Sequence, residues 1–529
     1  MCGIAYVSGP GASSATFRAM LDAQRPRGEV EEVSIGDGLL AGTQRLRIVD
    51  AERAVQPWAS GDGRWLLCYN GEVFNHDALR DELRGLGRSF RTDSDTEVVL
   101  EAFLQWGENA VRRLRGEFAF VIADRRSGRT YLARDPLGVK PLYWSVRAGC
   151  LHVASEIKAL VSVGEPIRQV PGGHHGWAGP GEHPGLAPYA DLLSEDVTAP
   201  PIDDPNEAAR QVRAALADSI GVRVDTPLTV GVILSGGLDS SLTLAHVRQA
   251  HPDCVAFTIG APGSPDIAYA RRLAADLGVP HEVIELSPRD IRMADVREAI
   301  RISELTEYGD IINAVVSVPL FRRIGELGVK VVLTGDGSDE LFGGYPMYQL
   351  VGPADEQRLF LHKVVSLGRT ELQRVDRTSM AHGVEARVPF LDPAMVALAR
   401  RLPMDLKVRD GSEKWIVRQA FADFLPRYIL RRPKNPMSYS SGLHERARMY
   451  KPLFARIHRS LRYDLHEPVR RDFSIVLEKC GNDLDAALAR AGTRPDYTTR
   501  EHVRDLAGAA RWNAASLVGS LASPGRARA

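Results

Sequence analysis

Short apolar segments separated by turn residues fill the first third of the chain. They lie at residues 3–7, 39–41, 65–69, 118–122, 131–133 and 151–153, and they are rich in β-branched and aromatic residues. Helical periodicity is convincing near 76–86 and 95–107. This pattern predicts an α+β domain with antiparallel sheets and few helices.

A different pattern begins near residue 205. Asp204, Pro205 and Glu207 form a capping-box signature and predict the start of a helix. Beyond it, apolar strands at 228–234, 255–259 and 329–333 alternate with helices, and the chain is mostly helical from about residue 355. Such alternation predicts a doubly wound parallel sheet whose ligand lies at the carboxyl ends of the strands.

These patterns divide the chain into three parts. We expect an N-terminal domain at residues 2–185, a linker at 186–204 and an α/β domain with a helical C-terminal part at 205–515. The Pro, Gly and His residues that gather between about 168 and 205 favour an interdomain connection there.

The composition is that of a globular protein. The 529 residues are 44% hydrophobic and 25% charged, and the formal net charge is zero. There is thus no global charge footprint for nucleic acid or an anionic membrane. A signal peptide and a long apolar span are both missing from the sequence, so we expect a cytoplasmic protein.

Cys2 is the first candidate for chemistry. If Met1 is removed, the thiol of Cys2 lies beside a free α-amino group, whose pKa is about 7.7–8. That group could accept the thiol proton directly or through one water. The five cysteines are scattered without disulfide or metal-ligand spacing. The position predicts an N-terminal nucleophile, although a lone Met-Cys start is usually without function.

The second candidate is a glycine-rich loop between a strand and a helix. Residues 235–241 read SGGLDSS directly after the strand that ends at Leu234. Because the two glycines have no Cβ, their backbone amides can approach an anion closely, and the N-terminus of the following helix attracts negative charge. Asp239 would be repelled by phosphates unless it binds Mg²⁺. The loop predicts ATP and magnesium binding.

With both signatures in this order, the chain resembles the glutamine-dependent asparagine synthetase family. That family joins a glutaminase domain of the N-terminal nucleophile type to an ATP pyrophosphatase domain. The resemblance implies that Cys2 attacks the side-chain amide of glutamine. It assigns the oxyanion hole to Asn70 and Gly71, and glutamine binding to Arg45, Asn70, Glu72 and Asp95.

In the second domain the resemblance extends to residues 335–345, of sequence GDGSDELFGGY. It makes Asp339 the second Mg²⁺ ligand beside Asp239, and it makes Asp336 and Lys434 catalytic. The residues that it implies for ATP binding are Leu234, Ser235, Gly236, Gly237, Asp239, Ser240, Ile259, Gly335 and Lys434. The implied partners are glutamine, ATP and a carboxylate. The resemblance also allows a homodimer, although the sequence does not determine the oligomeric state.

The chain departs from the family at three places, of which the first bears on the conformation of its loop and on coupling between the two sites, and the other two leave the acceptor open. Residues 24–28 read QRPRG where the family usually has HRGPD, Asp336 replaces a usual glutamate, and residues 307–317 are mostly apolar where bacterial relatives recognise aspartate. The acceptor is then aspartate or another carboxylic acid, such as a biosynthetic intermediate. A β-lactam synthetase-like ring closure is a further alternative, but those enzymes generally lack the N-terminal cysteine.

Overall fold

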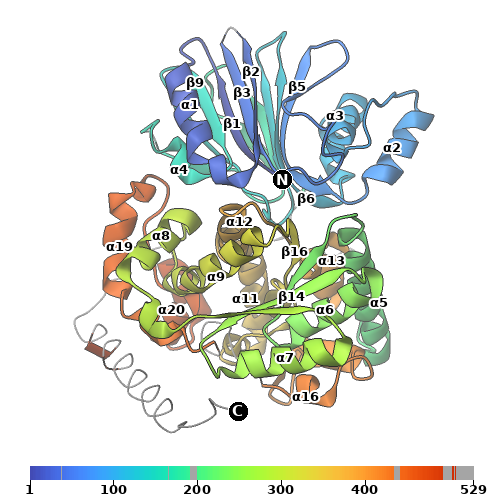
Figure 1. The fold of residues 1–529 in the computed structure, drawn as a ribbon, viewed down its shortest axis with the longest axis vertical. Coiled ribbons are helices and arrows are strands. Elements are labelled where there is room, and N and C mark those ends of the chain that lie inside the picture. The colour runs from blue at the N-terminus through green and yellow to red at the C-terminus, as the bar shows by residue number, and fades with distance from the viewer. Residues whose placement is uncertain are drawn as a thin grey trace, which may run out of the picture.

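Two stacked parts make up the molecule in the computed structural model (Figure 1). The structure describes residues 1–36, 38–164, 166–190, 199–433 and 441–491, together with Val503, Arg504 and Ala507. The upper part contains two antiparallel sheets and the N-terminus, and the lower part contains a parallel sheet surrounded by helices. Both predicted fold classes are confirmed.

The upper part is a sandwich of two six-stranded sheets. One has the order β10-β8-β9-β1-β3-β2 and the other the order β12-β11-β7-β6-β5-β4. The strands are β1 (Cys2–Ser8), β2 (Val30–Gly36), β3 (Leu39–Arg45), β4 (Trp58–Ala59), β5 (Trp65–Val73), β6 (Gly116–Asp124), β7 (Thr130–Arg134), β8 (Tyr143–Arg147), β9 (Cys150–Ala154), β10 (Arg168–Gln169), β11 (His174–Ala178) and β12 (Gly185–Pro188).

Apolar side chains on alternating faces hold this sandwich together. Ile4 and Tyr6 of β1 point into the core between the sheets, whereas Ala5 and Val7 pack against the outer helix α1 (Ser14–Ala23) and α4 (Ile157–Leu160). The other outer face is covered by α2 (His76–Gly85) and α3 (Asp95–Trp106). The period of two along β1 therefore buries both of its faces.

The lower part is built on a parallel sheet of order β15-β14-β13-β16-β17. Its strands are β13 (Val230–Ile233), β14 (Cys254–Gly260), β15 (His281–Glu285), β16 (Val331–Leu333) and β17 (Glu385–Arg387). The strand order reverses between β13 and β16, so the loops after these two strands open at a topological switch point. In open parallel sheets a crevice for ligands forms there.

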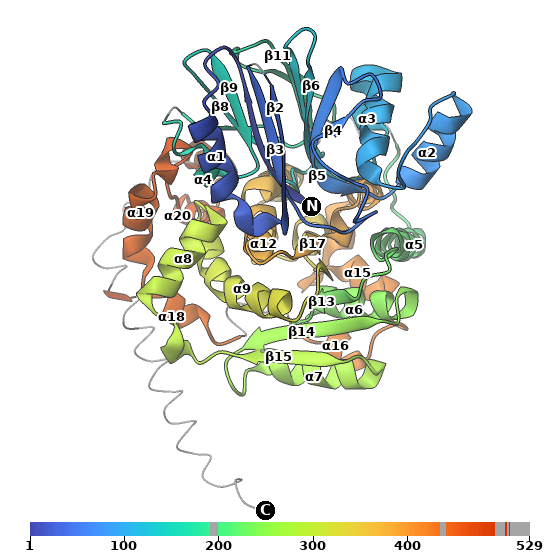
Figure 2. The ribbon, with the colours of Figure 1, turned by 45° about the horizontal axis from the view of Figure 1, so that its top comes forward.

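Helices surround the parallel sheet and continue to the C-terminal side. They are α5 (Pro205–Arg223), α6 (Leu238–Ala250), α7 (Pro265–Leu277), α8 (Met293–Ser303), α9 (Tyr308–Glu326), α10 (Ser338–Phe342), α11 (Pro353–Ser366), α12 (Glu371–Met380), α13 (Pro393–Arg401), α14 (Met404–Lys407), α15 (Trp415–Ala420), α16 (Arg427–Leu430), α18 (His444–Arg448), α19 (Lys451–Ser460), α20 (Phe473–Lys479) and α21 (Leu484–Arg490). Both views place α12 at the junction of the two parts (Figures 1 and 2).

The predicted start of the second domain coincides with a helix. Asp204 accepts a hydrogen bond from the Asn206 N–H at 2.9 Å, and Pro205 is the first residue of α5. The carboxylate of Glu207 accepts a hydrogen bond from Gln211 at 2.5 Å and pairs with Arg210.

In the described part of the chain, no helix is long and apolar enough to cross a membrane.

Candidate functional site

The first candidate site surrounds Cys2 at the start of β1. Cys2 is 1% exposed, and its backbone N–H donates to Oδ1 of Asn70 at 2.9 Å. The Sγ atom of Cys2 lies 3.5 Å from Nε2 of Gln56, which donates to it. β1 pairs with β3 so that Cys2 faces Arg45. The predicted nucleophile thus lies beside two of its predicted partners.

Asn70 presents a free donor next to the thiol. Its Nδ2 is buried and has no hydrogen-bond partner among the described residues, while its Oδ1 is occupied by the Cys2 N–H. A buried amide N–H without an acceptor lowers the stability of the fold, and a bound ligand can supply the missing acceptor. The neighbouring Gly71 is required by packing, because a Cβ there would lie 2.4 Å from the carbonyl oxygen of Glu117.

The charged residues predicted to bind glutamine lie on the strands and helix around this thiol. Nε of Arg45 donates to Glu32 at 3.0 Å. Oδ2 of Asp95 accepts from the Tyr69 hydroxyl at 2.6 Å and from the Val73 N–H at 3.1 Å. Burial raises the pKa of Glu72 to about 8, against the opposing effect of Arg387. Arg45 therefore has a carboxylate partner inside the protein, which sequence reasoning missed.

The ionisation of the thiol depends on what surrounds it. Burial raises the pKa of Cys2, and the α-ammonium and Arg45 oppose that rise. Met1 is itself buried, and its α-ammonium lies 3.8 Å from Oε2 of Glu385 in β17. A free α-amino group on Cys2 would stand one residue closer to the thiol.

The loop predicted to follow a strand and precede a helix does so. The SGGLDSS residues join β13 to α6, and Gly236 has a positive φ of 70°. A Cβ at Gly236 would lie 2.6 Å from Cβ of Tyr269, so only glycine fits without a shift. Ser235 and Ser240 are joined through their hydroxyls at 3.1 Å. Leu234 and Ile259 are buried at the ends of neighbouring strands, and Gly335 follows β16.

The two aspartates predicted to bind metal lie beside the same cation. Nζ of Lys414 lies 2.5 Å from Oδ2 of Asp239 and 2.6 Å from Oδ1 of Asp339. Asp239 also accepts from the Ser338 hydroxyl at 2.8 Å. Lys414 is 2% exposed and was not predicted, because a single lysine directly before a short helix carries no sequence signal.

The donor set fits a magnesium ion that arrives with a nucleotide. Among the described residues, no group of three or more His, Cys, Asp and Glu side chains could hold a metal by itself. Mg²⁺ at phosphate sites commonly takes one or two protein carboxylates and completes its shell with phosphate oxygens and water. Asp239 and Asp339 supply that pair, and the position of Lys414 shows that a cation fits between them.

A cavity of about 580 Å³ opens from this cradle toward α9 and α12. Asp336 lines it and accepts a hydrogen bond from Nη2 of Arg374 at 2.7 Å. Nη1 of Arg374 donates to the Ser317 hydroxyl at 3.4 Å. Arg374 was not predicted, since its partner lies 38 residues earlier in the sequence.

The far wall of the cavity is acidic. Asp310 and Glu307 of the α9 region meet Glu371 and Asp472 there. Asp310 is 8% exposed, and burial together with these neighbouring carboxylates raises its pKa well above the usual range. Residues 307–317 are mostly apolar, but the members of this stretch that line the cavity are Glu307, Gly309, Asp310, Asn313 and Ser317. Lys434 lies outside the described residues.

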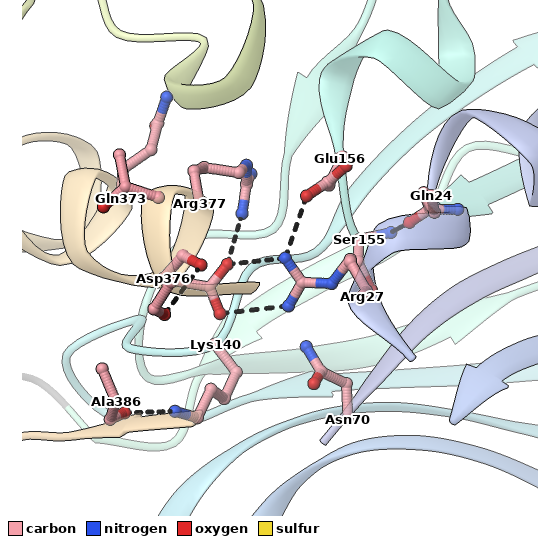
Figure 3. A network of polar contacts seen from close by, with 12 residues as sticks. Gln24, Arg27, Asn70, Lys140, Ser155, Glu156, Gln373, Asp376, Arg377 and Ala386 are labelled. Atoms are coloured by element: carbon pink, nitrogen blue, oxygen red, sulfur yellow. Dashed lines mark hydrogen bonds and ion pairs between the residues drawn. The ribbon is translucent and has the colours of Figure 1, made fainter. Parts of the chain in front are cut away.

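The loop that departs from the family lies between the two parts. Arg25 is exposed and pairs with Asp22, whereas Arg27 is buried and donates to the Cys2 carbonyl oxygen at 3.2 Å. Figure 3 shows Arg27 directed at Asp376 of α12 and at Glu156. Arg27, rather than Arg25, is the arginine that faces the site.

Comparisons with known proteins agree with this arrangement. A family described as "Glutamine amidotransferase domain" matches residues 1–170, and one described as "Asparagine synthase" matches 211–358 and 349–484. Among solved structures, a glutamine phosphoribosylpyrophosphate amidotransferase from B. subtilis aligns at a TM-score of 0.32 and 17% identity, over 63% of this chain and 81% of that one. A similarity this low carries no argument.

Curated relatives are closer. Asparagine synthetase B [glutamine-hydrolyzing] of Escherichia coli (strain K12) is 34% identical over 77% of this chain and 75% of its own length. Asparagine synthetase [glutamine-hydrolyzing] of Sandersonia aurantiaca is 34% identical over 77% of this chain and 79% of its own length. With two matching family domains in the expected order, the chain belongs to the glutamine-hydrolysing asparagine synthetase family.

Proposed function

We propose that this protein is a carbon–nitrogen ligase that amidates a carboxylic acid, using glutamine as the nitrogen donor and ATP as the activating substrate. The observation that carries the proposal is the presence of two candidate sites in one chain. One combines Cys2 with the free amide donor of Asn70. The other places Asp239 and Asp339 at the carboxyl ends of adjacent parallel strands.

At the first site, Cys2 attacks the side-chain carbonyl carbon of glutamine after Met1 is removed. The α-amino group takes the thiol proton and returns it to the leaving nitrogen, so that ammonia departs and a thioester remains. Nδ2 of Asn70 donates to the oxyanion that develops on the carbonyl oxygen. Water then hydrolyses the thioester to glutamate. Arg45 binds the α-carboxylate of glutamine, Asp95 binds its α-ammonium, and Glu72 helps to orient it.

At the second site, an oxygen of the acceptor carboxylate attacks the α-phosphorus of ATP, and pyrophosphate leaves. Asp239 and Asp339 would hold Mg²⁺, which neutralises phosphate charge when it is bound with ATP. Lys414 lies where its ammonium can move from the aspartates to a phosphate oxygen. Lys434 acts on the phosphates in the same step. Ammonia from the first site then displaces AMP from the acyl-adenylate and forms the amide.

Two acceptor classes are compatible with the cavity. Aspartate follows from the names of the relatives. Asp336 favours another carboxylic acid as the acceptor, because its carboxylate accepts a hydrogen bond from Arg374 and does not extend farther into the cavity. Pyrophosphate release across a panel of carboxylic acids separates the two classes. Release with aspartate alone excludes the second class, and release with another acid but not aspartate excludes the first.

The free donor of Asn70 beside Cys2 also argues against the β-lactam synthetase-like alternative, because ring closure with an internal amine needs no glutaminase. Amide formation in the Cys2→Ala variant tests the whole proposal. We expect this variant to lose glutamine-driven amidation and to keep amidation with added ammonium salt. Retention of glutamine-driven amidation contradicts the proposal. We further propose a cytoplasmic location. We also propose that the protein is a homodimer, and size-exclusion chromatography with light scattering tests this oligomeric state.

A further inference from the structure

Helix α12 presents one face to each proposed site. Arg374 and Asp376 are two positions apart on it, which corresponds to about 200° around a helix of 3.6 residues per turn. Arg374 therefore points toward the cavity of the lower part, where it holds Asp336 and contacts Ser317. Asp376 points the opposite way, toward the upper part (Figure 3). Helix α12 therefore lies between the cavity and the residues that surround Cys2.

On the upper face, Asp376 is joined to Cys2 through Arg27. Nη1 and Nη2 of Arg27 donate to the two carboxylate oxygens of Asp376 at 2.8 and 3.0 Å, a bidentate pair. Nε of the same guanidinium donates to the Cys2 carbonyl oxygen at 3.2 Å. One planar side chain thus fixes the distance between α12 and the residue that carries the nucleophile.

The surroundings leave this pair little freedom. Arg27 is 1% exposed and Asp376 is 3% exposed. Nη1 of Arg27 also donates to Glu156 at 3.0 Å, and Asp376 also accepts from Nη1 of Arg377 at 2.8 Å. Nε of Arg377 in turn donates a hydrogen bond to Oε2 of Glu304 at 2.9 Å. Because buried charges are neither hydrated nor screened by salt, a shift of one member displaces the others.

The same helix thus touches the acceptor cavity and the nucleophile residue. A carboxylate bound beside Asp336 competes with it for the guanidinium of Arg374. The Arg27–Asp376 pair connects α12, the helix that carries Arg374, to the carbonyl of Cys2. Neighbouring residue Arg25 has no such route, since its guanidinium pairs with Asp22 at the surface.

Building on the proposed function, we propose that Arg27 is a positioning residue that couples glutamine hydrolysis at Cys2 to occupancy of the acceptor cavity. It acts through Asp376 and α12 and touches no substrate. In the wild type, ATP and acceptor then accelerate glutamine hydrolysis, and about one glutamate forms per amide. When the link is lost, glutamine is hydrolysed whether or not an acceptor is activated.

The test compares Arg27→Met and Asp376→Asn with the matched control Arg25→Met. Glutamate, pyrophosphate and amide are each measured with glutamine as donor, with and without ATP and the acceptor that the carboxylate panel identifies. Amidation with ammonium salt serves as the readout of an intact second site. Coupling between sites typically amounts to about 5-fold to 150-fold. We therefore expect at least about fivefold stimulation of glutamate release in the wild type and in Arg25→Met.

For Arg27→Met and Asp376→Asn we expect ATP and acceptor to change the rate of glutamate release by less than about twofold. Several glutamates should form per amide, and ammonia-dependent amidation should not change. Arg27→Lys should recover part of the coupling, because it keeps the charge but not the bidentate geometry. Full stimulation in Arg27→Met overturns the inference. So does a parallel loss of ammonia-dependent amidation in both variants, which makes Arg27 a purely structural residue. Neither result bears on the proposed function, which is tested by Cys2→Ala.

Discussion

The amide of Asn70 has the most direct consequence at the scale of single residues. Its buried Nδ2 lacks a partner among the described residues, so it is available to a developing oxyanion. Replacing Asn70 by Leu should lower kcat for glutamate release about 10²–10³-fold, the usual effect of removing one oxyanion donor. Amidation with ammonium salt should not change. An unchanged kcat for glutamate release would show that Nδ2 does not serve the reaction.

Lys407 is a second residue with a measurable consequence. Its ammonium is fully buried over the ring of Phe360 at 3.5 Å, and no described residue accepts a hydrogen bond from it. Burial lowers the pKa of Lys407 to about 7, whereas a lysine in the unfolded chain titrates near 10.4. Between these values the unfolded chain binds more protons, so this residue makes the free energy of unfolding rise with pH.

Lys407→Met should therefore stabilise the protein. At pH 7 we expect the free energy of unfolding to rise by about 2–4 kcal/mol, from about 1.4 kcal/mol for each unit of pKa difference. The gain should shrink as the pH rises from about 7 and should be lost above about 10.4, where the amine is neutral in both the folded and the unfolded states. Urea unfolding at several pH values measures it. A gain that stays constant with pH would show that Lys407 is charged in the folded protein over the whole range.

Residue-level prediction from the sequence was possible where a motif fixes local geometry. Cys2, Asn70, Asp239 and Asp339 were predicted because each lies in a short signature with its own backbone context. Lys414 and Arg374 were missed, since their partners are distant along the chain and no local pattern distinguishes them from surface cations. The roles of all these residues stay predictions until the variants are measured.

At the scale of elements, the turn between β13 and α6 depends on one glycine. Gly236 has φ of 70°, and a Cβ there would press on Tyr269, whereas Gly237 has φ of −74° and open surroundings apart from the Ser235 hydroxyl at 3.3 Å. Gly236→Ala should raise KM for ATP about tenfold, because a strain of about 1–2 kcal/mol is taken up by the loop. Gly237→Ala is the matched control.

We expect the control to change KM for ATP less than about threefold. ATP-dependent pyrophosphate release with ammonium salt present measures both variants without involving Cys2. An equal effect of the two substitutions would mean that the loop needs two small residues to admit the nucleotide, and that the backbone conformation of Gly236 is not the reason.

Most elements follow from the apolar pattern, and the exceptions have physical reasons. The predicted strands at 3–7 and 65–69 correspond to β1 and β5, and the helix at 76–86 corresponds to α2. Strand β2 was missed, because it is an edge strand whose sequence VEEVSIG exposes Val33 and Ile35 and carries Glu32 toward Arg45. Strand β12 is an edge strand of the other sheet, and most of it falls within the linker that the sequence predicted at 186–204.

At the scale of the whole molecule, buried ion pairs join the upper and lower parts. Glu117 of β6 is 2% exposed and accepts hydrogen bonds from Lys140 of the same part at 3.1 Å, and from Nε of Arg223 in α5 at 3.1 Å. The N–H of Val388 after β17 donates to the same carboxylate at 3.1 Å. Lys140 and Arg223 hold the pKa of Glu117 below its usual range despite burial.

Glu117→Gln should lower the free energy of unfolding by about 3–5 kcal/mol, the usual cost of breaking a buried pair and leaving its cations uncompensated. Glu82→Gln is the matched control, because Glu82 pairs with Arg113 at the surface and should cost less than about 1 kcal/mol. We expect calorimetry to show one transition for the wild type. Separate transitions for the two parts would contradict a cooperative interface.

The sequence predicted the order of the two parts but not how they meet. Arg27 and Asp376 are distant along the chain, as are Glu117 and Arg223, and these pairs form only where the upper part meets α12 and α5. Within residues 24–28, the sequence does not tell which arginine faces the interface, and the structure buries Arg27 and exposes Arg25. An interface between domains carries no periodicity, so its residues resemble ordinary surface charges in the sequence.

The central claim is that the nitrogen released at Cys2 is the nitrogen that reaches the activated carboxylate at the second site. The most direct measurement supplies glutamine labelled with ¹⁵N in its side-chain amide, together with ATP, acceptor and an excess of unlabelled ammonium salt at a pH where little of it is free ammonia. Mass spectrometry of the product amide then reports the source of its nitrogen. The account predicts that the product carries mainly ¹⁵N. A product labelled only to the extent expected from mixing with the bulk ammonium would contradict it.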